Sequence, residues 1–143
     1  MIKNIPVQQA HEQVSKGETY LDVRSVPEFE QGHPAGAYNI PLLHMDPDTR
    51  QMFPNHDFLT VVQATFAPET PLVVGCQAGA RSMQACQVLS QAGYTQLANV
   101  AGGFRGSRTG DQGWVDAALP VETAADAARQ YETLQARAAG PAR

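Results

Sequence analysis

Short apolar or alternating runs follow one another along the chain, and segments with helically spaced apolar residues lie between them. The runs predict strands at 3–7, 20–24, 37–40, 72–74 and 96–100. The intervening segments predict helices at 7–16, 27–31, 57–66 and 82–92. Strands that alternate with helices are typical of an α/β domain, so we expect a mostly parallel central sheet with helices on both faces.

Local signals set several of the connections. Ser25 stands where the second helix should begin, and Glu28 follows three residues later, which is the pattern of a capping box. Two prolines and several polar residues favour a loop at 43–55, and glycines favour irregular structure at 104–116.

The length of 143 residues suits a single domain. Near its end, the alanine-rich segment 123–139 predicts a C-terminal helix, with a frayed tail as the alternative. We therefore expect the main domain at 1–122, and a C-terminal helix and tail at 123–143 packed on that domain.

The composition excludes several functional classes. The chain is 43% hydrophobic and 17% charged, which is ordinary for a globular protein. A formal net charge of −4 argues against nucleic acid as the main partner, because nucleic-acid-binding proteins usually carry a basic face. No apolar run approaches the length of a membrane span, so no membrane partner is expected. The first residues lack the apolar core of a signal peptide, so the cytoplasm is the expected compartment.

The candidate chemistry lies in the loop that begins at Cys76. The only other cysteine is Cys86, and the two form neither a metal-binding nor a Cys-x-x-Cys pattern. We therefore expect no metal. Cys76 follows a buried strand and precedes a helix, where unpaired backbone amides and the helix dipole favour a thiolate.

The loop residues after Cys76 suit the binding of an anionic sulfur. Backbone amides can point inward, Gly79 allows a positive φ, and Arg81 adds a charge that can bind a sulfite group through two parallel N–H bonds. The expected substrate-binding loop consists of Gln77, Ala78, Gly79, Ala80, Arg81 and Ser82.

Several separated motifs together resemble the rhodanese family. They are Leu21-Asp22-Val23-Arg24, Glu28-Phe29, Gly32-His33-Pro34-Ala35-Gly36-Ala37-Tyr38-Asn39-Ile40-Pro41, Cys76-Gln77-Ala78-Gly79-Ala80-Arg81-Ser82 and Gly102-Gly103. The resemblance extends from about Ile5 to Val121. It is greatest to single-domain members of the plant senescence-associated and bacterial type.

The resemblance implies a rhodanese-like fold and a thiosulfate sulfurtransferase without metal or organic cofactor. Cys76 matches the catalytic cysteine of the family, which holds a sulfane sulfur as a persulfide, and Arg81 matches its loop arginine. The implied substrates are thiosulfate or another persulfide donor, and cyanide or a thiol as acceptor.

Three other functions stay open. The domain could be a sulfur-carrier or interaction module that a partner protein loads. It could be a phosphatase or arsenate reductase, but loops of the tyrosine-phosphatase type have one more residue between cysteine and arginine. If the loop is treated as a ring of Cα atoms ~3.8 Å apart, the extra residue increases the radius of the ring by about half an ångström. The shorter loop of this chain therefore favours a single sulfur atom over a tetrahedral oxyanion. A non-catalytic regulatory domain is disfavoured because Cys76 is present.

Four further residues could form the rim of the site. Asp22 and Arg24 either shape the rim or form a structural ion pair, in which Arg24 could bind Glu28. Arg105 and Arg108 either steer dianions toward the loop or are solvated charges.

Three more residues receive structural interpretations. His33 is expected to stabilise a turn, because the sulfur chemistry needs no base, and Cys86 is expected to pack in the core. Trp114 lies farther beyond the Gly102-Gly103 turn than the family pattern places it, which indicates an insertion near the site entrance.

Overall fold

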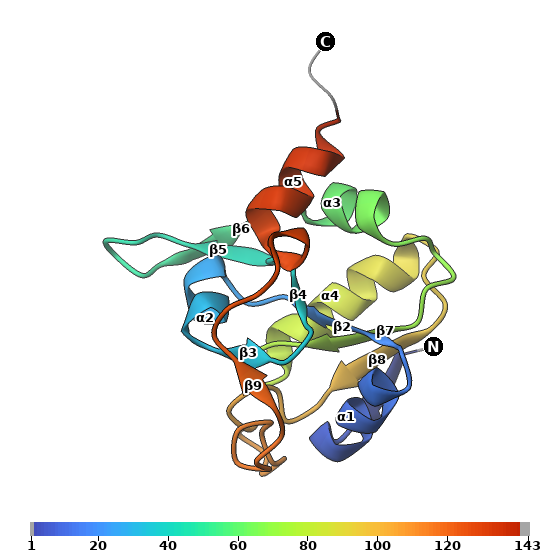
Figure 1. The fold of residues 1–143 in the computed structure, drawn as a ribbon, viewed down its shortest axis with the longest axis vertical. Helices are drawn as coiled ribbons and strands as arrows, with labels where there is room; N and C mark the ends of the chain where they lie inside the picture. Colours follow the sequence, from blue (N-terminus) through green and yellow to red (C-terminus); the bar gives the residue numbers. More distant parts are fainter. Residues whose placement is uncertain (1, 141–143) are drawn as a thin grey trace.

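A five-stranded parallel sheet forms the centre of the molecule, in a computed structural model that describes residues 2–140 (Figure 1). The strand order is β1-β8-β7-β2-β4, and every neighbouring pair is parallel. The strands are β1 (Ile2–Ile5), β2 (Thr19–Asp22), β4 (Tyr38–Asn39), β7 (Leu72–Gly75) and β8 (Leu97–Val100). The parallel sheet predicted from the sequence is confirmed.

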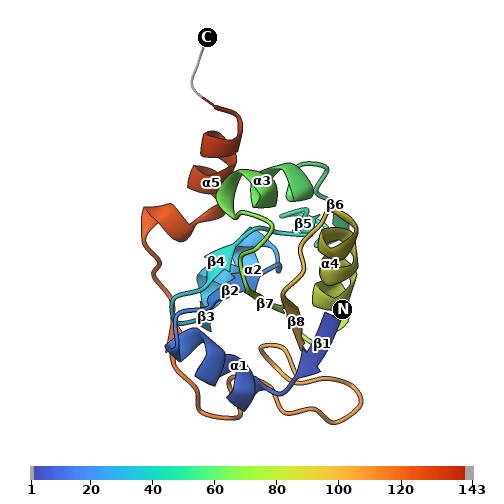
Figure 2. The same ribbon diagram turned by 90° about the vertical axis from the view of Figure 1, so that its right-hand side faces the viewer.

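Helices cover both faces of this sheet, also as predicted. They are α1 (Val7–Ser15), α2 (Val26–Gln31), α3 (Phe58–Thr65), α4 (Ala80–Gln91) and α5 (Tyr131–Ala138). Figure 2 shows α1 on one side of the sheet and α3 and α4 on the other, with α5 beside α3. Among the described residues, no helix has the length and apolar character needed to cross a membrane.

Two hydrophobic cores lie between the sheet and its helices, one on each face of the sheet. Val73 of the central strand packs with Val7 of α1, whereas its neighbour Val74 packs with Val62 of α3 and Leu89 of α4. This division follows from the alternation of side chains along a strand. Because β7 is buried along its whole length, the residue that follows it is held in place from both faces.

The capping box predicted at α2 is present. The Ser25 side chain accepts a hydrogen bond from the backbone of the third helical residue, and Glu28 Oε1 accepts from the Ser25 backbone N–H at 3.1 Å. This box fixes the orientation of Glu28, which matters for the site below.

The loop predicted at 43–55 is wrong in part, because this segment contains an antiparallel hairpin. Its strands are β5 (Leu43–Met45) and β6 (Met52–Pro54), and the hairpin projects from the body of the molecule (Figure 1). The turn is closed by Asp46, whose carboxylate accepts hydrogen bonds from the backbone N–H groups of Asp48 and Thr49. Proline is tolerated here because both strands are edge strands.

The C-terminal helix is present and packs on the domain, but it begins later than predicted. Residues Val121–Glu122 form β9, which pairs with β3 (His33–Pro34), and a short 3-10 turn at Ala127–Arg129 precedes α5. The Glu122 carboxylate accepts hydrogen bonds from Arg129 and from the Gly36 backbone, and these contacts keep the chain extended. Residues 141–143 of the expected tail lie outside the described part of the chain.

Candidate active site

Cys76 lies at the carboxyl end of the central strand, where ligands bind in open parallel sheets. Its sulfur accepts a hydrogen bond from the Gly79 backbone N–H at 3.1 Å and lies 3.3 Å from the Ser82 hydroxyl. The thiol is free, and the residue is 2% exposed. One amide of the loop and the hydroxyl of a residue in the first turn of α4 therefore lie against the sulfur.

Gly79 makes this arrangement of the loop possible. It is the N-cap of α4 and adopts the left-handed conformation, with φ of 100°. A Cβ atom there would lie 2.6 Å from the carbonyl oxygen of Ala101. Any other residue would therefore combine backbone strain with a steric clash.

The Gly102-Gly103 turn braces the loop from outside. The backbone N–H of Phe104 donates to the Cys76 carbonyl at 2.9 Å, and that of Arg105 donates to the Gln77 carbonyl at 3.0 Å. A Cβ on Gly103 would lie 2.6 Å from the Gln77 oxygen, so only glycine permits this approach. These two hydrogen bonds hold the start of the cysteine loop against the turn.

Arg81 does not face the sulfur with free N–H groups. Its two terminal nitrogens bind both carboxylate oxygens of Glu28, at 2.8 and 3.0 Å. Burial alone would raise the pKa of Glu28, but the hydrogen bonds and charge of Arg81, together with Ser25, lower it to about 2. Burial alone would lower the pKa of Arg81, because it disfavours the charged guanidinium, but the hydrogen bonds and charge of Glu28 raise this pKa instead. Binding of a donor by Arg81 stays a prediction.

Arg24 pairs with Asp22, so the expected ion pair with Glu28 is wrong. Two nitrogens of Arg24 bind the Asp22 carboxylate, and Nη2 also donates to the Gly32 carbonyl at 2.7 Å. Nη1 lies 3.4 Å from the Gln77 side-chain oxygen. The Asp22 carboxylate, two residues away, already pairs with the Arg24 guanidinium, and Glu28 of α2 pairs with Arg81 instead. Arg24 thus ties β2 to the first residue of the cysteine loop.

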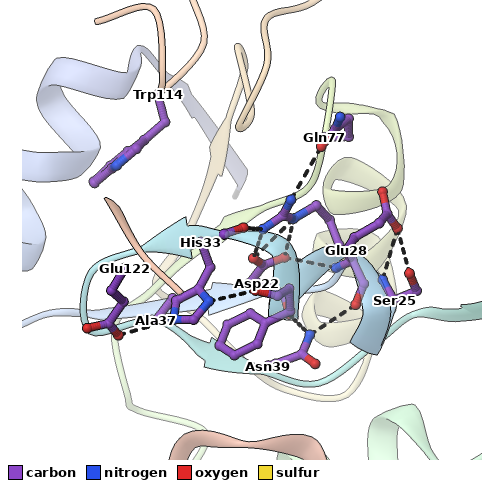
Figure 3. A network of polar contacts seen from close by, with 12 residues as sticks. Asp22, Ser25, Glu28, His33, Ala37, Asn39, Gln77, Trp114 and Glu122 are labelled. Carbon is purple, nitrogen blue, oxygen red and sulfur yellow. Dashed lines mark hydrogen bonds and ion pairs between the residues drawn. The ribbon is translucent and has the colours of Figure 1, made fainter. Parts of the chain in front are cut away.

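His33 has the structural role that the sequence predicts. The side chain is fully buried and stacked on Phe29, with Nδ1 2.7 Å from the Phe29 carbonyl and Nε2 3.1 Å from Glu122 (Figure 3). It connects the turn after α2 to β9 and does not contact Cys76.

Cys86 is a core residue, as expected. It is fully buried in the cluster that contains Val74 and Leu89. Burial, with a smaller effect of the charge of Cys76, raises the pKa of the Cys86 thiol to about 12. A neutral thiol in this position takes no part in nucleophilic chemistry.

The rim arginines differ in position. Arg105 follows the bracing turn, and its guanidinium lies 5.4 Å from the centre of the Phe104 ring. Together with Arg24, Glu28 and Gln77, it lines a cavity of about 60 Å³ beside the loop. Arg108 is exposed farther along the same segment and does not line this cavity.

Trp114 lies in the core and not at the site entrance. It is 1% exposed, makes edge-on contacts with Tyr20 and His11, and donates its indole N–H to the Pro120 carbonyl at 2.8 Å. The added length before Trp114 therefore forms an exposed loop, while the indole anchors the chain against the α1 face.

Sequence reasoning missed the polar residues behind the loop. Asn99 of β8 accepts a hydrogen bond from the Ser82 hydroxyl at 2.5 Å, and Asn4 of β1 accepts one from Asn99 at 2.9 Å. The signal available was a polar residue within a buried strand, since Asn99 is 3% exposed.

Comparisons with known proteins identify the family of the chain. Residues 6–108 match the rhodanese-like domain family, and the chain belongs to that family. Thiosulfate sulfurtransferase 16, chloroplastic, from Arabidopsis thaliana is 36% identical over 119 residues, which cover 83% of this chain and 92% of the relative. Thiosulfate sulfurtransferase GlpE from Haemophilus influenzae is 31% identical over 122 residues, covering 85% and 96%.

A solved structure has a similar fold. The crystal structure of Rv0390 from M. tuberculosis superposes with a TM-score of 0.70 at 26% identity, covering 85% of this chain and 98% of that one. The resemblance drawn from the sequence motifs is thus confirmed, as is the rhodanese-like α/β fold.

Proposed function

We propose that this protein is a sulfurtransferase in which Cys76 takes a sulfane sulfur from thiosulfate, or from another persulfide donor, and passes it to cyanide or a thiol. The observation that carries the proposal is the set of contacts of the Cys76 sulfur. The Gly79 N–H and the Ser82 hydroxyl, at 3.1 and 3.3 Å, can both donate hydrogen bonds to an anionic sulfur. The names of the relatives support thiosulfate as the donor.

The reaction needs two displacements at sulfur. The Cys76 thiolate attacks the sulfane sulfur of thiosulfate, a new S–S bond forms, and the old S–S bond breaks with its electron pair leaving on sulfite. Cyanide then attacks the terminal sulfur of the persulfide and leaves as thiocyanate, which returns the thiolate. Neither step transfers a proton or uses a metal or organic cofactor. The protein therefore contributes mainly the stabilisation of negative charge on sulfur.

We assign the capture of the anionic donor first to Arg105. Arg24 and Arg81 each bind a carboxylate, whereas Arg105 forms no ion pair within residues 2–140. Its position beside the loop lets it offset the charge of a dianion despite the net charge of −4 of the chain. Arg81 could join only by releasing Glu28, and Arg108, which does not line the cavity beside the loop, is left to steer the donor from a distance.

The carrier role remains the alternative within the same chemistry. A cysteine that is 2% exposed is more accessible to a small donor than to a thiol presented by a protein. The phosphatase or arsenate reductase alternative needs space for a tetrahedral oxyanion, and the Gly79 amide already contacts the sulfur at 3.1 Å. The cytoplasmic location stays a prediction.

Formation of thiocyanate from thiosulfate and cyanide tests the proposal. The purified protein should turn over, and Cys76→Ala should abolish turnover because no other described thiol lies in the loop. p-Nitrophenyl phosphate should not be hydrolysed. Sulfur transfer from a cysteine desulfurase with none from thiosulfate would favour the carrier role, and phosphatase activity would replace the proposal.

A further inference from the structure

A chain of side-chain hydrogen bonds connects the Cys76 sulfur to the edge of the sheet. The sulfur lies 3.3 Å from Ser82 Oγ, Ser82 Oγ lies 2.5 Å from Asn99 Oδ1, and Asn99 Nδ2 lies 2.9 Å from Asn4 Oδ1. Asn99 and Asn4 are directly paired across β8 and β1. Ser82 and Asn99 are buried, whereas Asn4 is exposed. The chain thus runs from a buried sulfur to solvent.

Counting protons fixes the direction of this chain. Ser82 has one hydroxyl proton, and two of its neighbours, Asn99 Oδ1 and the Gly79 carbonyl at 3.2 Å, can only accept. The Ser82 hydroxyl therefore donates its proton to one of these two oxygens, and the shorter contact is the one to Asn99 Oδ1. Ser82 Oγ then has only lone pairs to offer to the sulfur. This arrangement suits a neutral thiol that donates its S–H to Ser82.

An anionic sulfur requires the opposite direction. A thiolate has no proton to donate, so the lone pairs of Ser82 would face a negative charge. Rotating the terminal amides of Asn99 and Asn4 by half a turn exchanges their oxygen and nitrogen positions. Asn4 then donates to Asn99, Asn99 donates to Ser82, and the Ser82 hydroxyl donates to the sulfur. Each link of the chain from Asn4 to the sulfur is retained, with the 2.5 Å Ser82–Asn99 contact lengthening to fit an N–H donor, and the Ser82 hydroxyl gives up its contact with the Gly79 carbonyl.

We propose that Asn99 and Asn4 are positioning residues that turn the Ser82 hydroxyl toward Cys76 whenever its sulfur is anionic. This inference rests on the proposed function in that it assumes an anionic sulfur during turnover. Asn4 can reverse without loss because water can satisfy its exposed groups. Asn99 is buried and keeps a partner at each end in both directions.

The other titratable groups that act on Cys76 belong to two elements. Tyr20 comes from β2, while Arg81 and Cys86 come from α4. None of them contacts Asn4, which lies on the edge strand. Substitutions at Asn4 therefore change the chain of amides and leave these neighbours as they are.

The variant Asn4→Asp tests the inference, because a carboxylate can only accept. The carboxylate would accept a hydrogen bond from the Asn99 side-chain nitrogen, which keeps the Asn99 side-chain oxygen facing Ser82. The Ser82 hydroxyl would then go on donating to Asn99 and not to the sulfur. Lys3→Gln is the matched control, since it changes the net charge by the same amount at the adjacent exposed position of β1. Cys86→Ser serves as the background, so that one thiol remains.

Two readouts apply to each protein across a pH series. Ultraviolet absorbance, with the Cys76→Ser spectrum subtracted, reports thiolate formation. A hydrogen bond to a charged acceptor changes an ionisation equilibrium by about tenfold or more. Asn4→Asp, which withholds the Ser82 donor from the thiolate, should therefore raise the pH midpoint of Cys76 thiolate formation by about one unit. Lys3→Gln should shift it far less. In the parent protein, the Asn99 side-chain amide resonance should move with the same midpoint and should not move in Cys76→Ser.

Equal midpoints for Asn4→Asp and Lys3→Gln would overturn the inference, as would an Asn99 resonance that ignores the ionisation of Cys76. Both readouts are independent of sulfur transfer. Absence of thiocyanate formation with a coupled Asn99 signal would therefore refute the proposed function alone, and turnover without that coupling would refute only this inference.

Discussion

Replacement of Glu28 by glutamine isolates the ion pair that anchors Arg81. Glutamine keeps an oxygen that can accept from Ser25, so the capping box is retained while the charge is removed. The Arg81 guanidinium, whose side chain is 18% exposed, would then lose its charged partner. We expect Glu28→Gln to destabilise the fold and to loosen the arginine at the start of α4.

The magnitude follows from the pKa of Glu28, which falls from 4.5 to about 2. A difference of this size corresponds to about 3 kcal/mol, and partial solvent exposure reduces the expected cost to about 1–2 kcal/mol. A carboxyl with a lowered pKa stabilises the fold above its unfolded pKa, and the contribution disappears as the pH falls through the folded value. The cost of Glu28→Gln should therefore be complete at pH 7 and shrink between about pH 4.5 and pH 2.

Urea unfolding at a series of pH values measures this cost. Trp114 is the single tryptophan and is buried, so its fluorescence reports the transition. Glu30→Gln is the matched control, because Glu30 is exposed on the same helix and forms no ion pair in the described residues. A cost for Glu28→Gln that matches the control, or one that stays constant down to the lowest pH, would refute the reasoning.

Other substitutions test the remaining assignments. Cys86→Ser should retain most sulfur-transfer activity, and a loss as large as that of Cys76→Ala would contradict its role in packing. Arg105→Ala should raise KM for thiosulfate severalfold more than KM for an uncharged persulfide donor, whereas Arg108→Ala should change both little; equal effects in steady-state assays would exclude Arg105 as the docking cation. Gly79→Ala should cost more unfolding free energy than Gly17→Ala, since both have φ near 100° but only the first meets a backbone carbonyl. Equal urea midpoint shifts would contradict that contact.

The sequence predicts the sheet, its helices and the cysteine loop because these features are local. Apolar runs such as the one before Cys76 and the Ser25 and Glu28 box act over a few residues. The hairpin at 43–55 was missed because Pro47 lies in its turn and Pro54 ends an edge strand, two places that tolerate proline. The late start of α5 was missed because Val121–Glu122 pairs with residues far back in the chain.

The partners of the charged residues could not be predicted in the same way. Arg81 binds Glu28, 53 residues earlier, and this choice depends on α2 lying against the loop. Arg24 had two acidic candidates within reach, and only the folded backbone selects Asp22. Asn99 gave a signal as a polar residue in a buried strand, but its link to Ser82 appears only when α4 packs on the sheet.

Mass spectrometry of the intact protein and its peptides after treatment with thiosulfate, without an acceptor, tests the central claim most directly. The account predicts a gain of one sulfur atom on the peptide that contains Cys76, its removal by cyanide, and no gain in Cys76→Ala. A sulfur found on Cys86, or turnover to thiocyanate with no sulfur ever bound to the protein, would contradict it.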